Sequence, residues 1–510
     1  MKKHLIVLLC IIIISNLMPA CITAREGDSG YEGGISSGEV PGKTLYDYQE
    51  VCFLSGEPVV FKGTLTLKKS TKSNDILSTY TYNLKNIDRS AALTKTLTLD
   101  SLMTTKENGQ TVEETSIAKY SETIKLGNLT YTLKNYDFTR SNLIDHKPAV
   151  DYYAGNLWGK KTYQITGGTG TSTASGTITV EETGNFYGYG QYWGTVEVQN
   201  LSYIIDCQAK KGSTVDNWGG TADVNLSSST TKEISYVKNK PGSISFSGGY
   251  IQTQHNESIL EYSCSLPEFD QKGISTDNLI DKKDSIKLES FPVQTRLPVP
   301  STSNLKGHWA ENEINMLFSL EIFNGKGSDF NPEQYITREQ FASAINNAAK
   351  EVPVDPALVN KTASRVTISS KNNKQPIVSP FDDVKVSNKY FTDISNVYKR
   401  GIMNAKSPGL FSPKGTVTVA DAVSVFIKAL GLESMASDSA PVTTFKDNSK
   451  IPANSRIAVY VAAQIGLIEA DESGYLHPTD KLTNAKAAVM LNNFINYMRN
   501  GITNDYKDRM

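Results

Sequence analysis

The chain has 510 residues, which is too many for one hydrophobic core, so we expect three or four folding units. Lys and Arg together number 52 against 53 for Asp and Glu, so no overall charge directs the protein to nucleic acid or to an anionic membrane. Tyrosines (25) far outnumber tryptophans (4), which suits tyrosine-rich β-structure in an exported protein.

The first 24 residues predict a signal peptide. Two lysines precede an apolar run over residues 5–14, which is too short to span a bilayer, and small residues permit cleavage before Arg25. In the alternative interpretation, residues 17–21 form a lipoprotein box and Cys21 carries a lipid; ordinary cleavage is favoured because two residues fit that box poorly. No later run is long enough for a membrane helix, so the mature chain is expected to have none.

Residues 25–44 are rich in Gly, Ser and acidic residues and predict a flexible leader. Within it, residues 34–38 read GISSG, a formal match to the G-x-S-x-G nucleophile elbow. That elbow requires a strand, a turn and a helix, and no strand-like run precedes it here. We therefore expect no catalytic role for this serine.

Residues 45–285 are predicted to form an all-β domain. Apolar residues alternate with Thr, Ser, Lys and Asn, as at Phe61, Leu65 and Leu67 and again over residues 178–180. Glycine-rich turns separate the runs, and no long helical pattern interrupts them. The expected fold class is a sandwich or an extended multi-hairpin sheet.

The titratable residues of the β-domain carry no recognisable catalytic or metal-binding pattern. The adjacent pairs Glu113–Glu114 and Glu181–Glu182 would point to opposite faces of a strand, so we expect them to be solvated. The histidines that follow the signal peptide lack metal-ligand spacing, and no phosphate-binding loop occurs. We therefore predict no catalytic residue, metal or cofactor.

Three cysteines lie in the β-domain. They are Cys52, Cys207 and Cys264. They allow at most one internal disulfide and leave one thiol over, and the sequence does not select the pair.

An aromatic–glycine run over residues 186–194 has two interpretations. Aromatic rings in strands normally fill a core or pair across strands, and this is the interpretation we favour. Exposed rings, however, stack on sugars and fill protein interfaces.

Residues 286–302 hold several prolines among Ser and Thr and are predicted to be a linker at the main domain boundary. Beyond them, a Pro-to-Thr interval of five residues recurs three times, at 332–337, 413–418 and 478–483. The repeat predicts three modules, and the larger offset between the first two predicts an inserted loop. The modules are placed at residues 303–350, 379–432 and 443–500, and the loop at residues 351–378.

The first repeat begins at Gly307 and reads GHWAENEINMLFSLEIFNGKGSDFNPEQYITREQFA. It resembles the S-layer homology (SLH) module of bacterial surface proteins, with its HWA, FxP and ITRAEF landmarks. The resemblance implies an all-α cluster of three modules in a pseudo-threefold arrangement. It also implies a secreted protein of the bacterial cell wall, bound non-covalently to acidic, pyruvylated secondary cell-wall polysaccharide. Lateral self-assembly into an S-layer is left open.

The second helix of the first module carries the predicted attachment chemistry. Thr337 and Gln340 fit a capping box, which places Arg338 in the first turn, where free backbone N–H groups favour an anion. Arginine also suits a carboxylate as a bidentate partner. The resemblance carries the role of polysaccharide contact to Thr337 and Arg338, because Val419 and Asn484 occupy the matching positions of the later modules.

Three further residues are candidate sugar contacts. Trp309 is either a core residue, which we favour, or a platform on which a sugar stacks. Gly325 and Gly327 form a turn that could present N–H groups to the polysaccharide, although a plain turn is slightly favoured.

Taken together, these patterns predict a non-enzymatic surface protein whose β-domain is structural or adhesive. The alternative is an anchored carbohydrate-binding protein or glycoside-active enzyme in which the β-domain does the work. Paired carboxylates in an aromatic-lined groove would favour the alternative.

Overall fold

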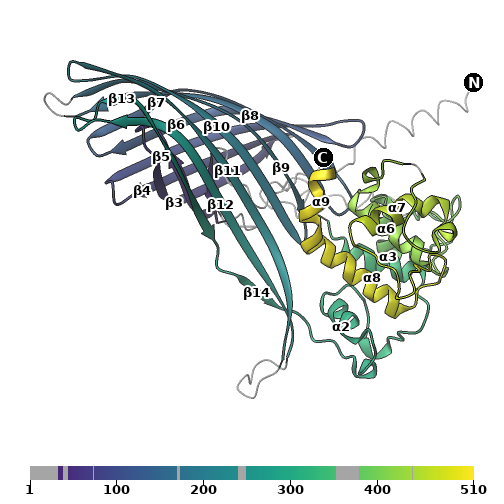
Figure 1. Cartoon of the computed structure of the whole chain (residues 1–510). Coiled ribbons are helices and arrows are strands. Elements are labelled where there is room, and N and C mark those ends of the chain that lie inside the picture. The colour runs from purple at the N-terminus through teal and green to yellow at the C-terminus, as the bar shows by residue number, and fades with distance from the viewer. Residues whose placement is uncertain are drawn as a thin grey trace, which may run out of the picture.

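A computed structural model describes residues 33–37, 44–72, 74–168, 173–238, 248–351, 378–438 and 440–509. The predicted signal peptide, Cys21 and nearly all of the predicted inserted loop lie outside these residues. Figure 1 shows a large curved sheet with a compact group of helices packed against one end of it.

The sheet is one antiparallel meander, so the multi-hairpin alternative for the β-domain is confirmed. Strands β1 to β13 follow one another in space in the order of the sequence, and β14 pairs with β12. The strands are β1 (Gly34–Ser36), β2 (Leu45–Cys52), β3 (Val59–Lys72), β4 (Asp75–Asn86), β5 (Ala91–Thr105), β6 (Thr111–Leu126), β7 (Leu129–His146), β8 (Asp151–Gly167), β9 (Ala174–Gln191), β10 (Gly194–Lys211), β11 (Thr214–Val237), β12 (Gly249–Phe269), β13 (Ser275–Glu289) and β14 (Val293–Arg296).

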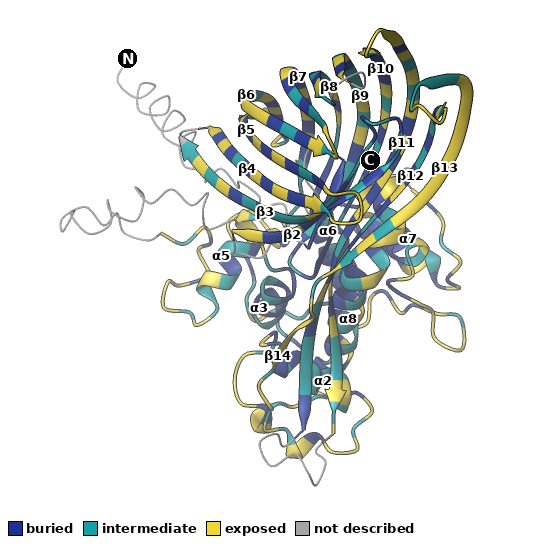
Figure 2. Cartoon of the chain, turned by 90° about the vertical axis from the view of Figure 1, so that its left-hand side faces the viewer, coloured by how far each residue is buried: buried dark blue, intermediate teal, exposed yellow. Residues whose placement is uncertain are grey.

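The sheet curls until its first strand contacts its last strands. Strand β1 contacts β11, β12 and β13, and the Ser258 hydroxyl donates to the Ser36 carbonyl at 2.9 Å. The inner face therefore closes around an apolar core, to which alternate residues contribute, as Ala222, Val224 and Leu226 do in β11. The residues between them face water, as the banded strands of Figure 2 show.

Two predicted boundaries of the β-domain differ from the structure. Residues 34–36 of the predicted leader form β1, with Ile35 fully buried against the core, and they pair with β2. The predicted linker contains the end of β13 and all of β14. These three segments are short or charged, so the sequence carries too little alternation to reveal them.

Among the described residues, the helical region contains three helix pairs followed by a C-terminal helix. The pairs are α2 (Glu311–Ser319) with α3 (Arg338–Ala348), α5 (Phe391–Lys399) with α6 (Val419–Leu430), and α7 (Arg456–Gln464) with α8 (Asn484–Asn496). A π-helical turn at Tyr497–Gly501 leads into α9 (Ile502–Arg509). No helix in the described part of the chain is long and apolar enough to cross a membrane.

The three helix pairs are joined in a closed ring. At the start of each second helix, the first two backbone N–H groups donate to carbonyls of the loop before the next second helix. These bonds run from Arg338 and Glu339 to Gly415 and Pro413, from Val419 and Ala420 to Asp480 and Pro478, and from Asn484 and Ala485 to Gln334 and Pro332, at 2.8–3.1 Å. Because the third pair bonds back to the first, the arrangement has approximate threefold symmetry.

Equivalent aspartates support the repeat in the second and third pairs. Asp383 and Asp447 each accept two backbone N–H bonds from the loop that precedes the second helix. Burial alone would raise the pKa of Asp447, but these N–H donors lower it overall. The donors are Phe411 and Ser412 in one pair and Leu476 and His477 in the other.

The sheet caps the ring of helices at the ends of the second helices. The Trp193 indole N–H donates to the Ala348 carbonyl at 2.9 Å, and the Tyr152 hydroxyl donates to the Leu430 carbonyl at 3.1 Å. Sheet residues and helices share one apolar cluster, in which Trp193 is fully buried. The sheet and the helices therefore form a continuous body, not two domains connected only by a linker.

Candidate functional site

A groove of about 260 Å³ lies beside α3, between the loop of the first helix pair and the start of α5. We call it the α3 groove. Its residues come from all three helix pairs, because Asn484 at the start of α8 also contributes. They are Phe318, Ile322, Phe323, Asn324, Gly325, Lys326, Asp329, Phe330, Asn331, Gln334, Ile336, Gln340, Ser343, Ala344, Lys389, Tyr390 and Asn484.

Two lysines give the α3 groove a positive rim. Lys326 lies on the loop and Lys389 immediately before α5, and both side chains are exposed. The Lys389 ammonium lies 4.5 Å from the centroid of the Tyr390 ring, a cation–π distance. Asp329 is the one acidic residue that lines the groove. The lining therefore carries a formal charge of +1, which favours an anionic ligand.

The remaining lining offers both hydrogen-bonding groups and aromatic faces. Phe318, Phe323 and Phe330 pack against one another with ring centroids 5.2–5.7 Å apart, which fixes the loop. Five amide side chains and a serine surround them: Asn324, Asn331, Gln334, Gln340, Asn484 and Ser343. Amides beside aromatic rings can bind the hydroxyl groups and apolar faces of sugars.

Of the five predicted contact residues, Gly325 is the one that lines the α3 groove. It has φ of +110°, which glycine adopts readily, and this turn shapes the loop. Gly327 packs against Ser301 and Thr302 without room for a Cβ atom, so its backbone faces the protein and not the groove.

Trp309 is not a core residue. Its side chain is 62% exposed and lies beside His308, with ring centroids 5.6 Å apart. The favoured core interpretation is therefore wrong, because the helix buries Ile314 and Leu317 instead. A role of Trp309 in stacking on sugars stays a prediction, at a surface separate from the α3 groove.

Thr337 caps α3 as predicted. Its hydroxyl accepts the Gln340 N–H at 3.4 Å, and its own N–H donates to the Gln340 side-chain oxygen at 2.9 Å. The expectation of free N–H groups at this helix start is wrong, however, because Arg338 and Glu339 donate theirs to neighbouring carbonyls. Carbonyl groups of the second helix pair therefore occupy the position at which an anion was expected to bind.

Arg338 fastens the first helix pair to the second. Its Nε donates to the Phe411 carbonyl at 2.8 Å and its Nη2 to the Asn404 carbonyl at 2.9 Å, while the guanidinium lies 4.7 Å from the Phe411 ring centroid. Burial lowers the pKa of Arg338, and the charges of Asp421 and Asp383 oppose that effect. Direct contact of Arg338 with polysaccharide stays a prediction.

The sequence did not single out Lys389 as a binding residue. Lys389 aligns with Trp309 in the first module. Comparing the repeats therefore identifies this position as equivalent to a candidate sugar contact, but it does not predict that a charged side chain binds the ligand there. The fold brings it to the loop of the first pair because α5 packs against α3.

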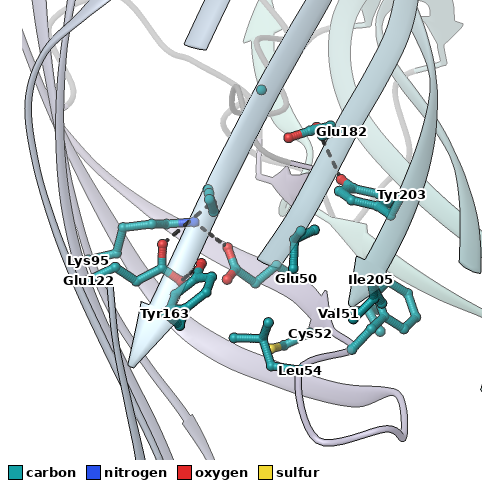
Figure 3. Close-up of a pocket in the computed structure, with 14 residues that line it drawn as sticks. Glu50, Val51, Cys52, Leu54, Lys95, Glu122, Tyr163, Glu182, Tyr203 and Ile205 are labelled. Atoms are coloured by element: carbon teal, nitrogen blue, oxygen red, sulfur yellow. Dashed lines mark hydrogen bonds and ion pairs between the residues drawn. The ribbon is translucent and has the colours of Figure 1, made fainter. Parts of the chain in front are cut away.

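A second cavity lies inside the sheet and holds buried charges. Lys95 is 2.9 Å from Glu50, Lys161 is 3.4 Å from Glu122, and the Tyr163 hydroxyl donates to Glu122 at 3.0 Å. Figure 3 shows Lys95, Glu50, Glu122 and Tyr163 around the cavity. Its volume is about 70 Å³, which is room for a few water molecules. We interpret it as a structural network.

The two glutamate pairs are only partly solvated. Glu182 is buried and accepts from the Tyr203 hydroxyl at 3.2 Å, and Glu113 is buried and accepts from Asn142 at 3.0 Å. Their neighbours Glu181 and Glu114 lie on the outer face. The two glutamates of each pair point to opposite faces, as predicted. The prediction that both are solvated is wrong, because the inner face of the sheet is closed.

The aromatic–glycine run supplies packing. Phe186, Tyr189 and Trp193 are buried, and the Tyr189 hydroxyl lies 2.8 Å from that of Thr503 in α9. The favoured interpretation is confirmed, with part of the run contributing to the interface with the helices.

Cys52, Cys207 and Cys264 are free thiols in the structure.

A third hollow, of about 690 Å³, opens on the outer face of strands β4 to β8. We call it the outer groove. Trp158 is 36% exposed there, and its indole N–H donates to Glu181 at 3.1 Å. Three carboxylates line the groove with it, from Asp75, Asp100 and Glu114. An aromatic ring beside carboxylates is a combination that carbohydrate sites use.

His146 lies in a hydrogen-bonded chain near the interface. Its Nδ1 is 2.8 Å from Asp151 and its Nε2 is 3.0 Å from the Thr111 hydroxyl. Burial lowers the pKa of His146, but the bond to Asp151 raises it overall. None of the three cavities above is lined by these residues, so we assign them a structural role. They hold the β7–β8 connection, where Ala149 donates to the Ala429 carbonyl at 2.9 Å.

Comparisons with known proteins agree with the architecture of the helical region. The family model of the S-layer homology domain matches residues 305–342 and 380–423. These segments contain α2 and α5 and the first turns of α3 and α6. The chain therefore carries SLH domains, which indicate a location at the cell surface.

Three curated proteins show partial similarity. An exoglucanase of Acetivibrio thermocellus is 24% identical over 192 residues, which is 37% of this chain and 16% of that protein. An amylopullulanase of Thermoanaerobacterium thermosulfurigenes is 23% identical over 192 residues, 37% of this chain and 9% of that protein. An endoglucanase of Bacillus sp. (strain KSM-635) is 28% identical over 141 residues, 28% of this chain and 14% of that protein. The match thus spans less than a fifth of each relative.

Proposed function

We propose that the three helix pairs are three SLH modules that bind acidic, pyruvylated secondary cell-wall polysaccharide, with the α3 groove as a principal site. The observation that carries the proposal is the positive rim of the groove, where Lys326 and Lys389 face a lining of amides and aromatic rings. Residues 443–500 supply the third module, since their helices complete the ring and Asn484 enters the groove.

The two lysines would bind the carboxylate of the polymer, and the amides its hydroxyl groups. Ammonium groups at an exposed rim interact with a flexible polyanion without a fixed geometry, which suits a repeating polymer. Arg338 supports the site indirectly, because it fixes the neighbouring helix pair.

Removing both lysines is expected to weaken binding to purified cell walls by roughly tenfold or more, since charge-assisted hydrogen bonds are worth about 1.5–3 kcal/mol each before solvent screening. The measurement is cosedimentation of the secreted Lys326→Ala/Lys389→Ala chain with cell walls over a range of protein concentrations. Both side chains are exposed, so the fold is expected to persist. Lys385→Ala is the matched control: it removes an exposed charge of the same segment that does not line the groove, and should bind normally.

A second candidate function is carbohydrate binding or glycoside hydrolysis by the β-domain. The outer groove favours it, because Trp158 and three carboxylates line the same open hollow. The similarity to an exoglucanase, an amylopullulanase and an endoglucanase is compatible with it.

Trp158→Ala should weaken binding to soluble polysaccharides by roughly fivefold to tenfold in affinity electrophoresis, because a stacked aromatic ring contributes about 1–2 kcal/mol. Glu114→Gln should abolish any release of reducing sugar by the chain. Unchanged retardation of Trp158→Ala, with no hydrolysis by the native chain, would leave the β-domain a structural or adhesive unit. Trp218→Ala at the far end of the sheet is the control for loss of a tryptophan.

A further inference from the structure

Three exposed lysines lie in one row across the outer face of strands β3 to β6, which Figure 2 shows as consecutive strands of the curved sheet. In the register of the sheet, Lys62 of β3 is directly opposite Lys85 of β4, and Ala92 of β5 lies between Lys85 and Lys125 of β6. Because neighbouring strands are about 4.8 Å apart, the lysines follow one another at intervals of one and two strand spacings. We call these three residues the lysine row.

The lysine row has no acidic partner among the described residues. None of its three ammonium groups forms a salt bridge with them. The next residues of the row on either side, Gln49 and Thr130, are uncharged. Lys160 in β8, by contrast, lies 3.8 Å from Glu181. The lysine row is therefore a patch of positive charge that the sheet itself does not neutralise.

The structure of the sheet does not account for this arrangement. Like charges directly opposite one another destabilise a strand pair, so Lys62 and Lys85 do not stabilise the pairing of β3 with β4. Lysines also protect the free edges of sheets, but β3, β4 and β6 each pair with a strand on both sides. The lysine row therefore fits an anionic partner that lies outside the sheet.

A row of neutral polar side chains lies beside the lysine row on the same face. Its members are two residues away along each strand and are themselves cross-strand partners: Thr64, Asn83, Thr94 and Thr123. Their hydroxyl and amide groups can donate and accept hydrogen bonds. Positive charges beside such groups match a ligand that carries both carboxylates and hydroxyl groups.

We propose that the lysine row binds a polysaccharide that carries carboxylate groups, as a contact separate from the α3 groove. Ammonium groups on flexible stems bind carboxylates as point charges, without a fixed geometry. The adjacent threonines and asparagine bind the hydroxyl groups of the sugars. Binding at the lysine row depends on the sheet alone and does not require the α3 groove. When both sites hold one polymer, the second contact raises the overall affinity.

The test is affinity electrophoresis of the full secreted chain in gels that contain polygalacturonate, a carboxylate polysaccharide, with mobilities referred to gels without it. Every chain carries Lys326→Ala/Lys389→Ala, so a failure of the α3 groove leaves the result unaffected. Adding Lys62→Gln/Lys85→Gln/Lys125→Gln should weaken binding by about tenfold or more, because each exposed ion pair contributes a factor of about two to five. High salt, which screens exposed charges, should remove the difference.

The matched control is a triple variant of exposed lysines in β13, where Asp281, Asp284 and Glu289 lie among them. Lys282→Gln/Lys283→Gln/Lys287→Gln removes the same charge and should bind as before. Equal weakening by both triple variants would show attraction to net charge alone and would overturn the proposal. Retardation by polyphosphate but not by polygalacturonate would contradict a carboxylate ligand. Circular dichroism of each variant establishes that the sheet is intact.

Discussion

Trp193→Ala is expected to lower the free energy of unfolding by about 3–5 kcal/mol, the range for truncating a buried aromatic residue, and to loosen the sheet from the helices. Trp193 is fully buried, and its indole N–H donates to the Ala348 carbonyl at the end of α3. Truncation leaves a cavity in the apolar cluster that the sheet and the helices share. Calorimetry should show a lower first transition, and small-angle scattering a larger radius of gyration.

Two further variants separate packing from hydrogen bonding at this site. Trp193→Phe keeps a ring but leaves the Ala348 carbonyl without its donor, so a loss of about 1–2 kcal/mol is expected. Trp218→Ala removes a partly buried ring at the β10–β11 turn, away from the helices, and should leave the radius of gyration unchanged. If Trp193→Ala kept the native radius and transition temperature, the sheet and helices would not depend on this contact.

Arg338→Ala is expected to destabilise the helical region by about 2–4 kcal/mol, since hydrogen bonds from charged donors contribute about 1.5–3 kcal/mol each. The guanidinium donates to two carbonyls of the second helix pair and covers the Phe411 ring. Cell-wall binding should fall as well, because the α3 groove depends on the packing of α5 against α3. Thermal unfolding followed by circular dichroism at 222 nm measures the first effect.

Asn484 provides the control for Arg338, because it occupies the matching position in the third pair. Its side chain makes one neutral hydrogen bond, to the Asn331 carbonyl at 2.8 Å. Asn484→Ala should therefore cost only about 1 kcal/mol. If both variants lost the same free energy of unfolding, the guanidinium of Arg338 would contribute no more stability than the amide of Asn484. That result would contradict the role inferred for Arg338.

Local patterns predicted much of the fold. The period of two in the β-region defined a sheet of hairpins, and the five-residue Pro-to-Thr interval located the starts of α3, α6 and α8. The Thr337–Gln340 capping box needed only neighbouring residues, so the sequence was sufficient to predict it. These features depend on contacts close in sequence.

The features that the sequence did not predict depend on contacts between distant segments. Trp193 in β9–β10 and Ala348 in α3 are far apart in sequence, and neither carries a local sign of the interface. The N–H groups of Arg338 and Glu339 were expected to be free because their acceptors belong to another helix pair. Lys389 enters the α3 groove for the same reason.

We propose that the helical region anchors the chain through acidic wall polymer. The most direct measurement is the cosedimentation assay repeated on walls before and after extraction of that polymer, with the native and Lys326→Ala/Lys389→Ala chains side by side. We expect strong binding of the native chain to intact walls only, and weak binding of the variant to both. Equal binding of the native chain to intact and extracted walls would contradict it.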